Sequence, residues 1–129
     1  MSTPIRVAVV TESFLPQVNG VTNSVLRILE HLRAQGHQAL VIAPESIDGP
    51  KEYAGFRVKR VPSLEMKGLI PLAFPQRNLE QLLDGFAPDV IHLASPIFLG
   101  KYVTKIAQKL DIPTLSVYQT DIAGFARQP

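Results

Sequence analysis

One stretch of the chain, from Arg6 to Leu32, constrains the fold more than any other because it contains two patterns in a fixed order. The uncharged run Val7–Val10 predicts a buried strand over Arg6–Thr11, since β-branched residues suit a sheet that is covered on both faces. A polar loop, Glu12–Asn19, comes next. Gly20 then begins a series of apolar residues at helical spacing, namely Val21, Val25, Ile28, Leu29 and Leu32. The stretch therefore predicts a strand, a loop and a helix.

The start of this helix is a candidate anion-binding site. Backbone N–H groups and the positive end of the helix dipole would lie beside the loop. Gly20 would let an anionic group come close to the backbone because glycine has no Cβ. A glycine at this place is also common as a plain turn residue, so the residues alone leave both interpretations open.

The rest of the chain continues to alternate strands and helices. The first helix is predicted to end at Gln35, with Gly36 as a left-handed cap. Ser95 and Pro96 are expected to start the last complete helix. The predicted strands are Ala39–Ala43, Phe56–Val61, Asp89–Ala94 and Thr114–Tyr118; the predicted helices are Leu79–Phe86 and Leu99–Leu110; Ser46–Tyr53 is expected to be a loop.

This alternation predicts an α/β fold, a Rossmann-like doubly wound domain with a mostly parallel sheet. In such sheets ligands bind beyond the carboxyl ends of the strands, where the strand order reverses. Polar and charged residues gather at the predicted carboxyl ends, which are Thr11–Gly20, Ala43–Glu45, Ala94–Pro96 and Gln119–Gly124. We therefore expect the functional site at that edge.

Composition excludes several classes of function. The chain of 129 residues contains 46% hydrophobic residues and no cysteine, so we expect one globular domain without disulfides or thiolate chemistry. A net charge of +2 is too small to indicate nucleic-acid binding. The start of the sequence lacks the features of a signal peptide, and no apolar run approaches the roughly 20 residues that cross a bilayer. We expect a soluble, cytoplasmic protein.

Two carboxylates at predicted strand ends, Glu12 and Asp121, are candidates for acid–base chemistry. Each could instead be a cap, Glu12 of its own loop and Asp121 of the following helix. His92 lies within an apolar strand and is expected to be a hydrogen-bonded core histidine. No two of the residues His31, His37 and His92 have metal-ligand spacing on one element, so no metal site is predicted.

Two further features have alternative interpretations. The apolar segment Leu64–Pro75 contains prolines and a glycine, which predict a loop folded over the core. The alternative is an exposed apolar lip that contacts a lipid acceptor or a membrane surface. Lys101, Lys105 and Lys109 are spaced four residues apart on one predicted helix and favour a solvated face over a binding patch.

Four motifs carry a resemblance to a known family: TESFLPQVNGVTNSV, GHQALVIAPE, HLASP and VYQTDIAGFAR. Together they resemble the amino-terminal domain of family 4 retaining glycosyltransferases of the two-domain GT-B type. Within that family, the chain looks most like the actinobacterial GDP-mannose-dependent α-mannosyltransferases that build glycolipids. The resemblance covers nearly all of the chain but only the first part of a whole enzyme. It implies that residues 1–129 are an incomplete, acceptor-side domain and that the nucleotide-sugar-binding domain is absent.

The resemblance also implies an activity. The whole enzyme would transfer a hexose, mannose from GDP-mannose, to a lipid, polyol or other hydroxyl acceptor with retention of configuration. It would need no cofactor beside the nucleotide-sugar donor, which is a substrate. Contact with the inner face of a membrane is an open alternative to a purely cytoplasmic location, and the oligomeric state is left open. The isolated chain is expected to be inactive.

Roles for individual residues follow from the same resemblance. Asn19 and Gly20 match the family's glycine-containing loop, which lies near the diphosphate of the donor. Phe14, Val18 and Tyr118 would line the acceptor side.

Gln119 and Asp121 match the segment in which many family members have an active-site histidine, and they are the candidate catalytic residues. Residues 113–129 contain no histidine. The resemblance therefore leaves open which side chain handles the proton of the acceptor.

Two other functions use the same fold class. A nicotinamide- or flavin-binding domain should show G-x-G-x-x-G after the first strand, but TESFLPQVNG has a single glycine. A non-enzymatic interaction domain would use the apolar segment near Leu69–Phe74 as a protein interface. Binding of NAD, or a tight dimer without nucleotide or glycolipid binding, would favour these alternatives.

Overall fold

A computed structural model describes residues 3–61, 76–94 and 99–116 of the chain. These residues form a single six-stranded sheet with the strand order β3-β4-β2-β1-β5-β6. All neighbouring strands are parallel except β3 and β4. In chain order the elements are β1 Arg6–Val10, α1 Gly20–Ala34, β2 Gln38–Pro44, β3 Glu52–Tyr53, β4 Phe56–Val61, α3 Gln76–Phe86, β5 Val90–Leu93, α4 Leu99–Leu110 and β6 Thr114–Ser116.

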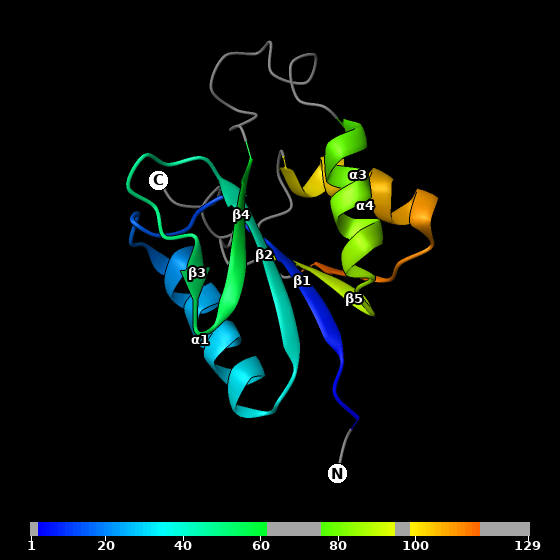
Figure 1. The fold of residues 1–129 in the computed structure, drawn as a ribbon. Coiled ribbons are helices and arrows are strands. Elements are labelled where there is room, and N and C mark those ends of the chain that lie inside the picture. The colour runs from blue at the N-terminus through cyan, green and yellow to red at the C-terminus, as the bar shows by residue number, and fades with distance from the viewer. Residues whose placement is uncertain (1–2, 62–75, 95–98, 117–129) are drawn as a thin grey trace, which may run out of the picture.

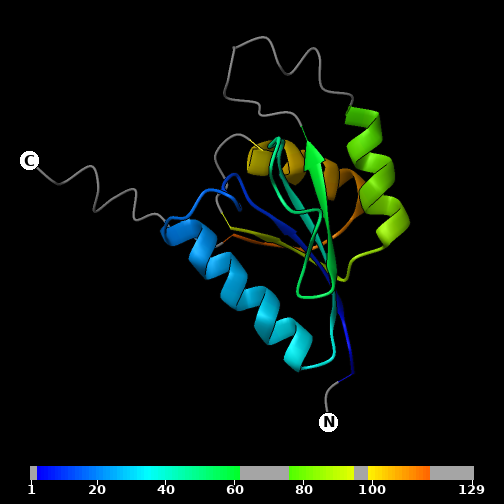
Figure 2. The same ribbon diagram turned by 60° about the vertical axis from the view of Figure 1, so that its left-hand side comes forward.

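Helices cover both faces of the sheet, with α1 on one side and α3 and α4 on the other (Figure 1 and Figure 2). Alternate residues of β1 divide between the two cores. Val7 and Val9 pack in the core that contains Val25 and Leu29 of α1. Ala8 and Val10 belong to the core that contains residues of α3 and α4, including Leu83, Val103 and Ile106. Burial on both faces explains why the strand contains no charge after Arg6, and it confirms the predicted α/β fold.

The predicted elements are present, with ends that differ by at most three residues where they are described: α3 starts at Gln76 instead of Leu79, and the predicted end of the last strand, Tyr118, lies outside the described residues. α1 ends at Ala34, with Gln35 as its cap residue, and Gly36 has a φ of +80°, the left-handed conformation that was predicted. The helices α3 and α4 are followed by Ala87 and Asp111, which also have positive φ values, of 54° and 59°. The segments Leu64–Pro75, Ser95–Pro96 and Gln119–Gly124 lie outside the described residues.

The prediction that Ser46–Tyr53 is entirely a loop was wrong at its end. Glu52 and Tyr53 form β3, which pairs antiparallel with β4. The turn between the strands uses Ala54 and Gly55, both with positive φ, of 54° and 83°. This conformation matches the twist of a two-residue hairpin. A two-residue strand has no periodicity of its own, so only its pairing with β4 reveals it.

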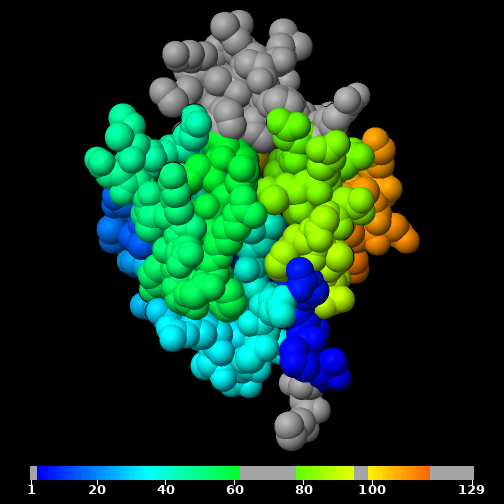
Figure 3. Space-filling view, viewed as in Figure 1, coloured from blue at the N-terminus to red at the C-terminus, as the bar shows by residue number. Residues whose placement is uncertain are grey.

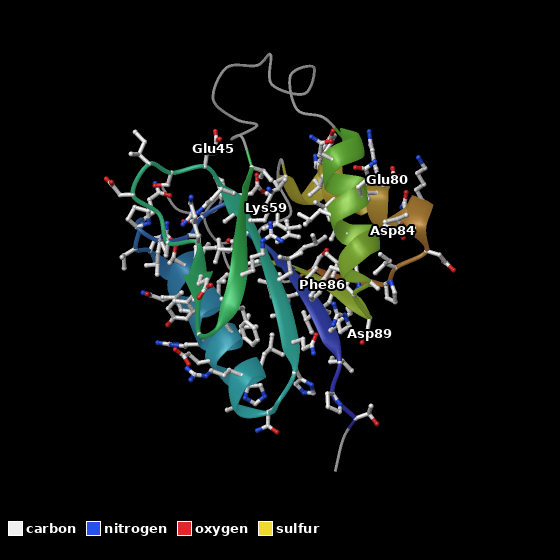
Figure 4. The ribbon with its side chains drawn as sticks, in the orientation of Figure 1. Glu45, Lys59, Glu80, Asp84, Phe86 and Asp89 are labelled. Carbon is white, nitrogen blue, oxygen red and sulfur yellow. The ribbon has the colours of Figure 1, made fainter. Side chains whose placement is uncertain are left out.

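Labelled side chains mark the two edges of the sheet in Figure 4. Phe86 and Asp89 lie at the amino-terminal edge, close to β1, whereas Glu45 and Lys59 lie toward the opposite edge (Figure 4). On the face seen in Figure 3, residues of β2 remain visible between β4 and α3. Among the described residues, no helix is long and apolar enough to cross a membrane.

Candidate functional site at the carboxyl edge of the sheet

The strand order reverses between β1 and β5. The chain places β2 on one side of β1 and later returns to add β5 on the other side. At this point Thr11 N–H donates to the carbonyl of Ile42 (3.0 Å) and Ala94 N–H donates to the carbonyl of Val10 (2.9 Å). The segment that follows β1, residues 11–19, is called the β1–α1 loop below. Because it leaves the sheet at the reversal, it lies where α/β proteins bind their ligands.

The end of the β1–α1 loop is held by a network of short polar side chains. Asn19 is the N-cap of α1, and its Oδ1 accepts the N–H of Thr22 (2.9 Å). Its Nδ2 donates to Oγ of Ser13 (2.7 Å), which also lies 3.0 Å from Oγ1 of Thr22. The Thr11 hydroxyl donates to the Ser13 carbonyl (2.6 Å). These bonds fix the start of α1 relative to the end of β1.

Gly20 is the first residue of α1. A Cβ added to it would meet no atom of the other described segments within 4 Å. The first hydrogen bond of the helix runs from Asn23 N–H to the Asn19 carbonyl (2.9 Å). The backbone N–H groups of Gly20 and Val21 precede it and have no acceptor within the helix. This geometry is compatible with the anion-site interpretation of Gly20, and anion binding itself stays a prediction.

Glu12 reaches across the reversal point to the second helix that starts there. Its Oε1 accepts the backbone N–H of Leu99, the first residue of α4, at 3.0 Å. A carboxylate at this place interacts favourably with the positive end of the helix dipole. Glu12 therefore caps α4. It does not merely cap its own loop, which was one of the two alternatives considered from the sequence.

Arg60, near the end of β4, is a residue of this edge that sequence reasoning missed. Its Nη1 donates to the Pro44 carbonyl (2.9 Å), and its Nη2 donates to the carbonyls of Leu15 (2.7 Å) and Pro50 (3.0 Å). Its guanidinium also lies 5.4 Å from the ring centroid of Phe14. Burial lowers the pKa of Arg60 from its ordinary value.

A signal for Arg60 was present in the alternation of β4. Residues 56, 58 and 60 share one face of the strand, and Val58 on that face is buried against the α1 side. Arg57 and Lys59 point the other way and are exposed. An arginine in phase with a buried valine indicates an inward-facing guanidinium that needs acceptors.

The predicted acceptor-side residues lie in different environments. Phe14 is only 3% exposed and packs edge-to-face on Tyr53, with centroids 6.3 Å apart. This gives the ring a packing role beneath the β1–α1 loop, and its contact with an acceptor stays a prediction. Val18 is 71% exposed. Tyr118, Gln119 and Asp121 lie outside the described residues, and their roles stay predictions.

His92 is buried in β5 and is paired in register with Val9 and Leu115. The sequence predicted a hydrogen-bonded core histidine. The burial is confirmed, but Nε2 has no hydrogen-bond partner in the part of the chain that the structure describes. Its neighbours on the adjacent strands are apolar side chains, which explains the missing partner. Burial lowers the pKa of His92. Among the described residues, no group of three or more His, Cys, Asp or Glu side chains could hold a metal ion.

Known proteins resemble this chain in both sequence and fold. Over nearly all of its length it is 50% identical to a GDP-mannose-dependent alpha-mannosyltransferase of Corynebacterium glutamicum and 52% identical to one of Mycobacterium tuberculosis. The alignments cover 97% and 95% of this chain but 32% and 34% of those proteins. The chain thus spans about a third of the length of these relatives.

Similarity of fold extends to more distant proteins. A glycosyltransferase from Rickettsia africae superposes with a TM-score of 0.64 at 13% identity, covering 92% of this chain and 30% of that protein. The glycotransferase of kitacinnamycin superposes with a TM-score of 0.60 at 17% identity, covering 89% and 30%. A family model described as Glycosyltransferase Family 4 matches residues 18–129. The chain belongs to glycosyltransferase family 4.

Proposed function

We propose that this chain is the acceptor-side, amino-terminal part of a retaining hexosyltransferase that transfers mannose from GDP-mannose to a lipid or other hydroxyl acceptor. The observation that carries the proposal is the 50–52% identity, over nearly the whole chain, to proteins named GDP-mannose-dependent alpha-mannosyltransferases. More distant relatives named alpha-monoglucosyldiacylglycerol synthase, at 26–27% identity, support a lipid acceptor. The second, nucleotide-binding domain would lie outside these 129 residues.

The geometry of the carboxyl edge supports a specific place for the diphosphate of the donor. Two helices, α1 and α4, begin at the reversal of strand order, and both offer backbone N–H groups to an anion. At α4 the carboxylate of Glu12 already accepts the Leu99 N–H, and its charge disfavours a second anion there. At α1 the N-cap Asn19 is neutral and Gly20 leaves its backbone open. We assign the diphosphate to the start of α1.

The chemistry of transfer needs further groups. In a retaining transfer the bond from sugar C1 to the diphosphate oxygen breaks, and the acceptor oxygen bonds to C1 on the same face. The parallel strand β6 ends at the same edge as the start of α1, and Gln119 and Asp121 come shortly after β6 in the sequence. We assign them to the reacting end of the acceptor, with Asp121 orienting the acceptor hydroxyl or accepting its proton. Tyr118 and Val18 would contact the rest of the acceptor.

The location follows from the substrates. We propose a cytoplasmic enzyme whose acceptor side meets the membrane surface that holds the lipid. No cofactor is assigned to the enzyme, since the nucleotide sugar supplies the activated sugar. The 129-residue chain alone should not transfer sugar, because the part that grips the donor nucleotide is missing.

The test uses the full-length protein that contains this chain. It is incubated with GDP-mannose or UDP-glucose and with diacylglycerol or monoglucosyldiacylglycerol in detergent, and the glycolipid products are identified by mass spectrometry and by NMR of the new anomeric centre. We expect an α-mannosylated lipid from GDP-mannose. Transfer from UDP-glucose alone would overturn the donor assignment. Binding of NAD without any transfer would favour a dinucleotide-dependent oxidoreductase.

A further inference from the structure

Three segments at the carboxyl edge of the sheet are joined by one side chain, that of Arg60. The carbonyls that it binds belong to Leu15 in the β1–α1 loop, Pro44 at the end of β2 and Pro50 in the segment before β3. Leu15 and Arg60 are 45 residues apart in sequence.

The surroundings of the guanidinium are shaped to hold it in one position. The ring of Phe14 lies beside it, 5.4 Å from centroid to Cζ. A Cβ placed on Gly49 would overlap the guanidinium, so only glycine leaves room for it there. The planar fork of arginine can donate to several carbonyls at once, which a lysine ammonium does with poorer geometry.

This arrangement costs more than simple packing would require. Arg60 is half-buried and burial disfavours its charge, yet none of the ion pairs among the described residues includes it. The carbonyls accept bonds only from Nη1 and Nη2, and the buried Nε has no hydrogen-bond partner among the described residues. A half-buried charge that is only partly satisfied is an expensive way to fill space, because an apolar side chain would pack there without the desolvation cost. The benefit of the arrangement is that the three carbonyl groups are held in a fixed position relative to one another.

We infer that Arg60 is a positioning residue that orders the β1–α1 loop and, through it, the donor-binding start of α1. Leu15 lies between Ser13, which bonds to Asn19 and Thr22, and the helix start itself. Anchoring the Leu15 carbonyl therefore fixes the middle of the loop, while the Asn19 network fixes its end. The kinetic part of this inference rests on the proposed function; the ordering of the loop does not.

The opposite edge of the sheet offers a matched control. Arg6 lies 4.3 Å from the ring centroid of Phe86, donates from Nε to the Phe86 carbonyl (2.7 Å) and binds Gln38. Phe86 marks this second site at the amino-terminal edge in Figure 4. The chemistry is the same, an arginine stacked on a phenylalanine and bound to carbonyl oxygens, but the site is remote from the helix start. Arg6→Met removes it.

The experiment compares four variants of the full-length protein: Arg60→Met, Arg60→Lys, Gly49→Ala and Arg6→Met. Each is measured for thermal unfolding, for amide hydrogen exchange of residues 11–22, and for kcat and KM with GDP-mannose and the lipid acceptor. Exchange reports local opening and needs no substrate. Gly49→Ala disturbs the guanidinium while Arg60 is kept, so it tests the same contact from the other side.

We expect Arg60→Met and Gly49→Ala to accelerate exchange in residues 11–22 and to lower kcat/KM for GDP-mannose by about 10- to 100-fold, as small displacements of binding groups do. Arg60→Lys should recover only part of this loss, because it restores the charge without the fork. Arg6→Met should lower the melting temperature to a similar degree but leave loop exchange unchanged and kcat/KM within about twofold.

Equal exchange in Arg60→Met and Arg6→Met would overturn the inference, as would full activity of Arg60→Lys or Gly49→Ala. If Arg60→Met does not fold, Gly49→Ala and Arg60→Lys still decide the question. Absence of turnover in the unmodified protein would instead count against GDP-mannose as donor, and the exchange comparison would still decide whether Arg60 orders the loop.

Discussion

Replacing Glu12 by alanine should destabilise the domain through the start of α4, a helix that begins 87 residues further along the chain. In the native structure Oε1 accepts the Leu99 N–H at 3.0 Å, and Leu99 is only 3% exposed. Water therefore has little access to this N–H when the carboxylate is removed. The alanine variant leaves a buried donor without an acceptor and removes a favourable charge from the positive end of the helix dipole.

The magnitude follows from these two losses. An unsatisfied buried donor costs about 1–3 kcal/mol, and loss of a helix cap costs about 0.5–2 kcal/mol. The two costs overlap and are not added, because both describe the loss of the same hydrogen bond. We expect Glu12→Ala to lower the free energy of unfolding by about 2 kcal/mol. At roughly 4 °C per kcal/mol for a domain of this size, the melting temperature should fall by about 8 °C. Glu12→Gln keeps an acceptor oxygen and loses only the charge, so its cost should be about 0.5–1 kcal/mol.

The assay is urea unfolding of the 129-residue chain, followed by circular dichroism at 222 nm, with the melting temperature as a second measurement. Glu12→Gln is the control that separates the hydrogen bond from the charge. Two results would refute the reasoning: an alanine variant within about 0.5 kcal/mol of the parent chain, or a glutamine variant that loses as much stability as alanine. In the full-length protein, a glutamine variant that is stable but inactive would restore the acid–base interpretation of Glu12.

Three further predictions follow from the same structure. Gly20→Val in the full-length enzyme should abolish transfer, because the added side chain blocks the diphosphate. The melting temperature should stay within a few degrees, since a Cβ at Gly20 meets no other described segment; normal kcat and KM would contradict this. Burial lowers the pKa of His92 below 6.5 in the folded chain. As the pH falls, the imidazole therefore takes up a proton at a higher pH in the unfolded chain than in the folded one, and stability should fall below about pH 6.5. His92→Leu should flatten that part of the stability–pH curve, and an unchanged slope in urea unfolding would count against it. Ala87→Gly should raise stability by about 0.5–1 kcal/mol, since Ala87 follows α3 with a φ of 54°; a lower melting temperature would refute this.

The sequence by itself determined the class of fold and the family. Strand and helix periods are local properties, and the patterns from Val7 to Val10 and from Val21 to Leu32 report burial within a few residues of the chain. The same holds for the Gly36 cap, because a left-handed residue after a helix favours glycine wherever the helix lies. The position of Gly20 at the start of a helix could be predicted for this reason, since it needs only a strand, a loop and a helix in that order.

Only the tertiary structure decided which distant groups meet at the site. Glu12 and Leu99 are separated by 87 residues and Arg60 and Leu15 by 45, so no local pattern specifies those bonds. Nor could the spacing of apolar residues reveal that Phe14 is buried under its own loop or that Nε2 of His92 has no partner among the described residues. Periodicity records which side of an element is covered, whereas the identity of the covering group depends on how the strands are ordered in the sheet. That order places β1 between β2 and β5, and with it Glu12 beside the start of α4.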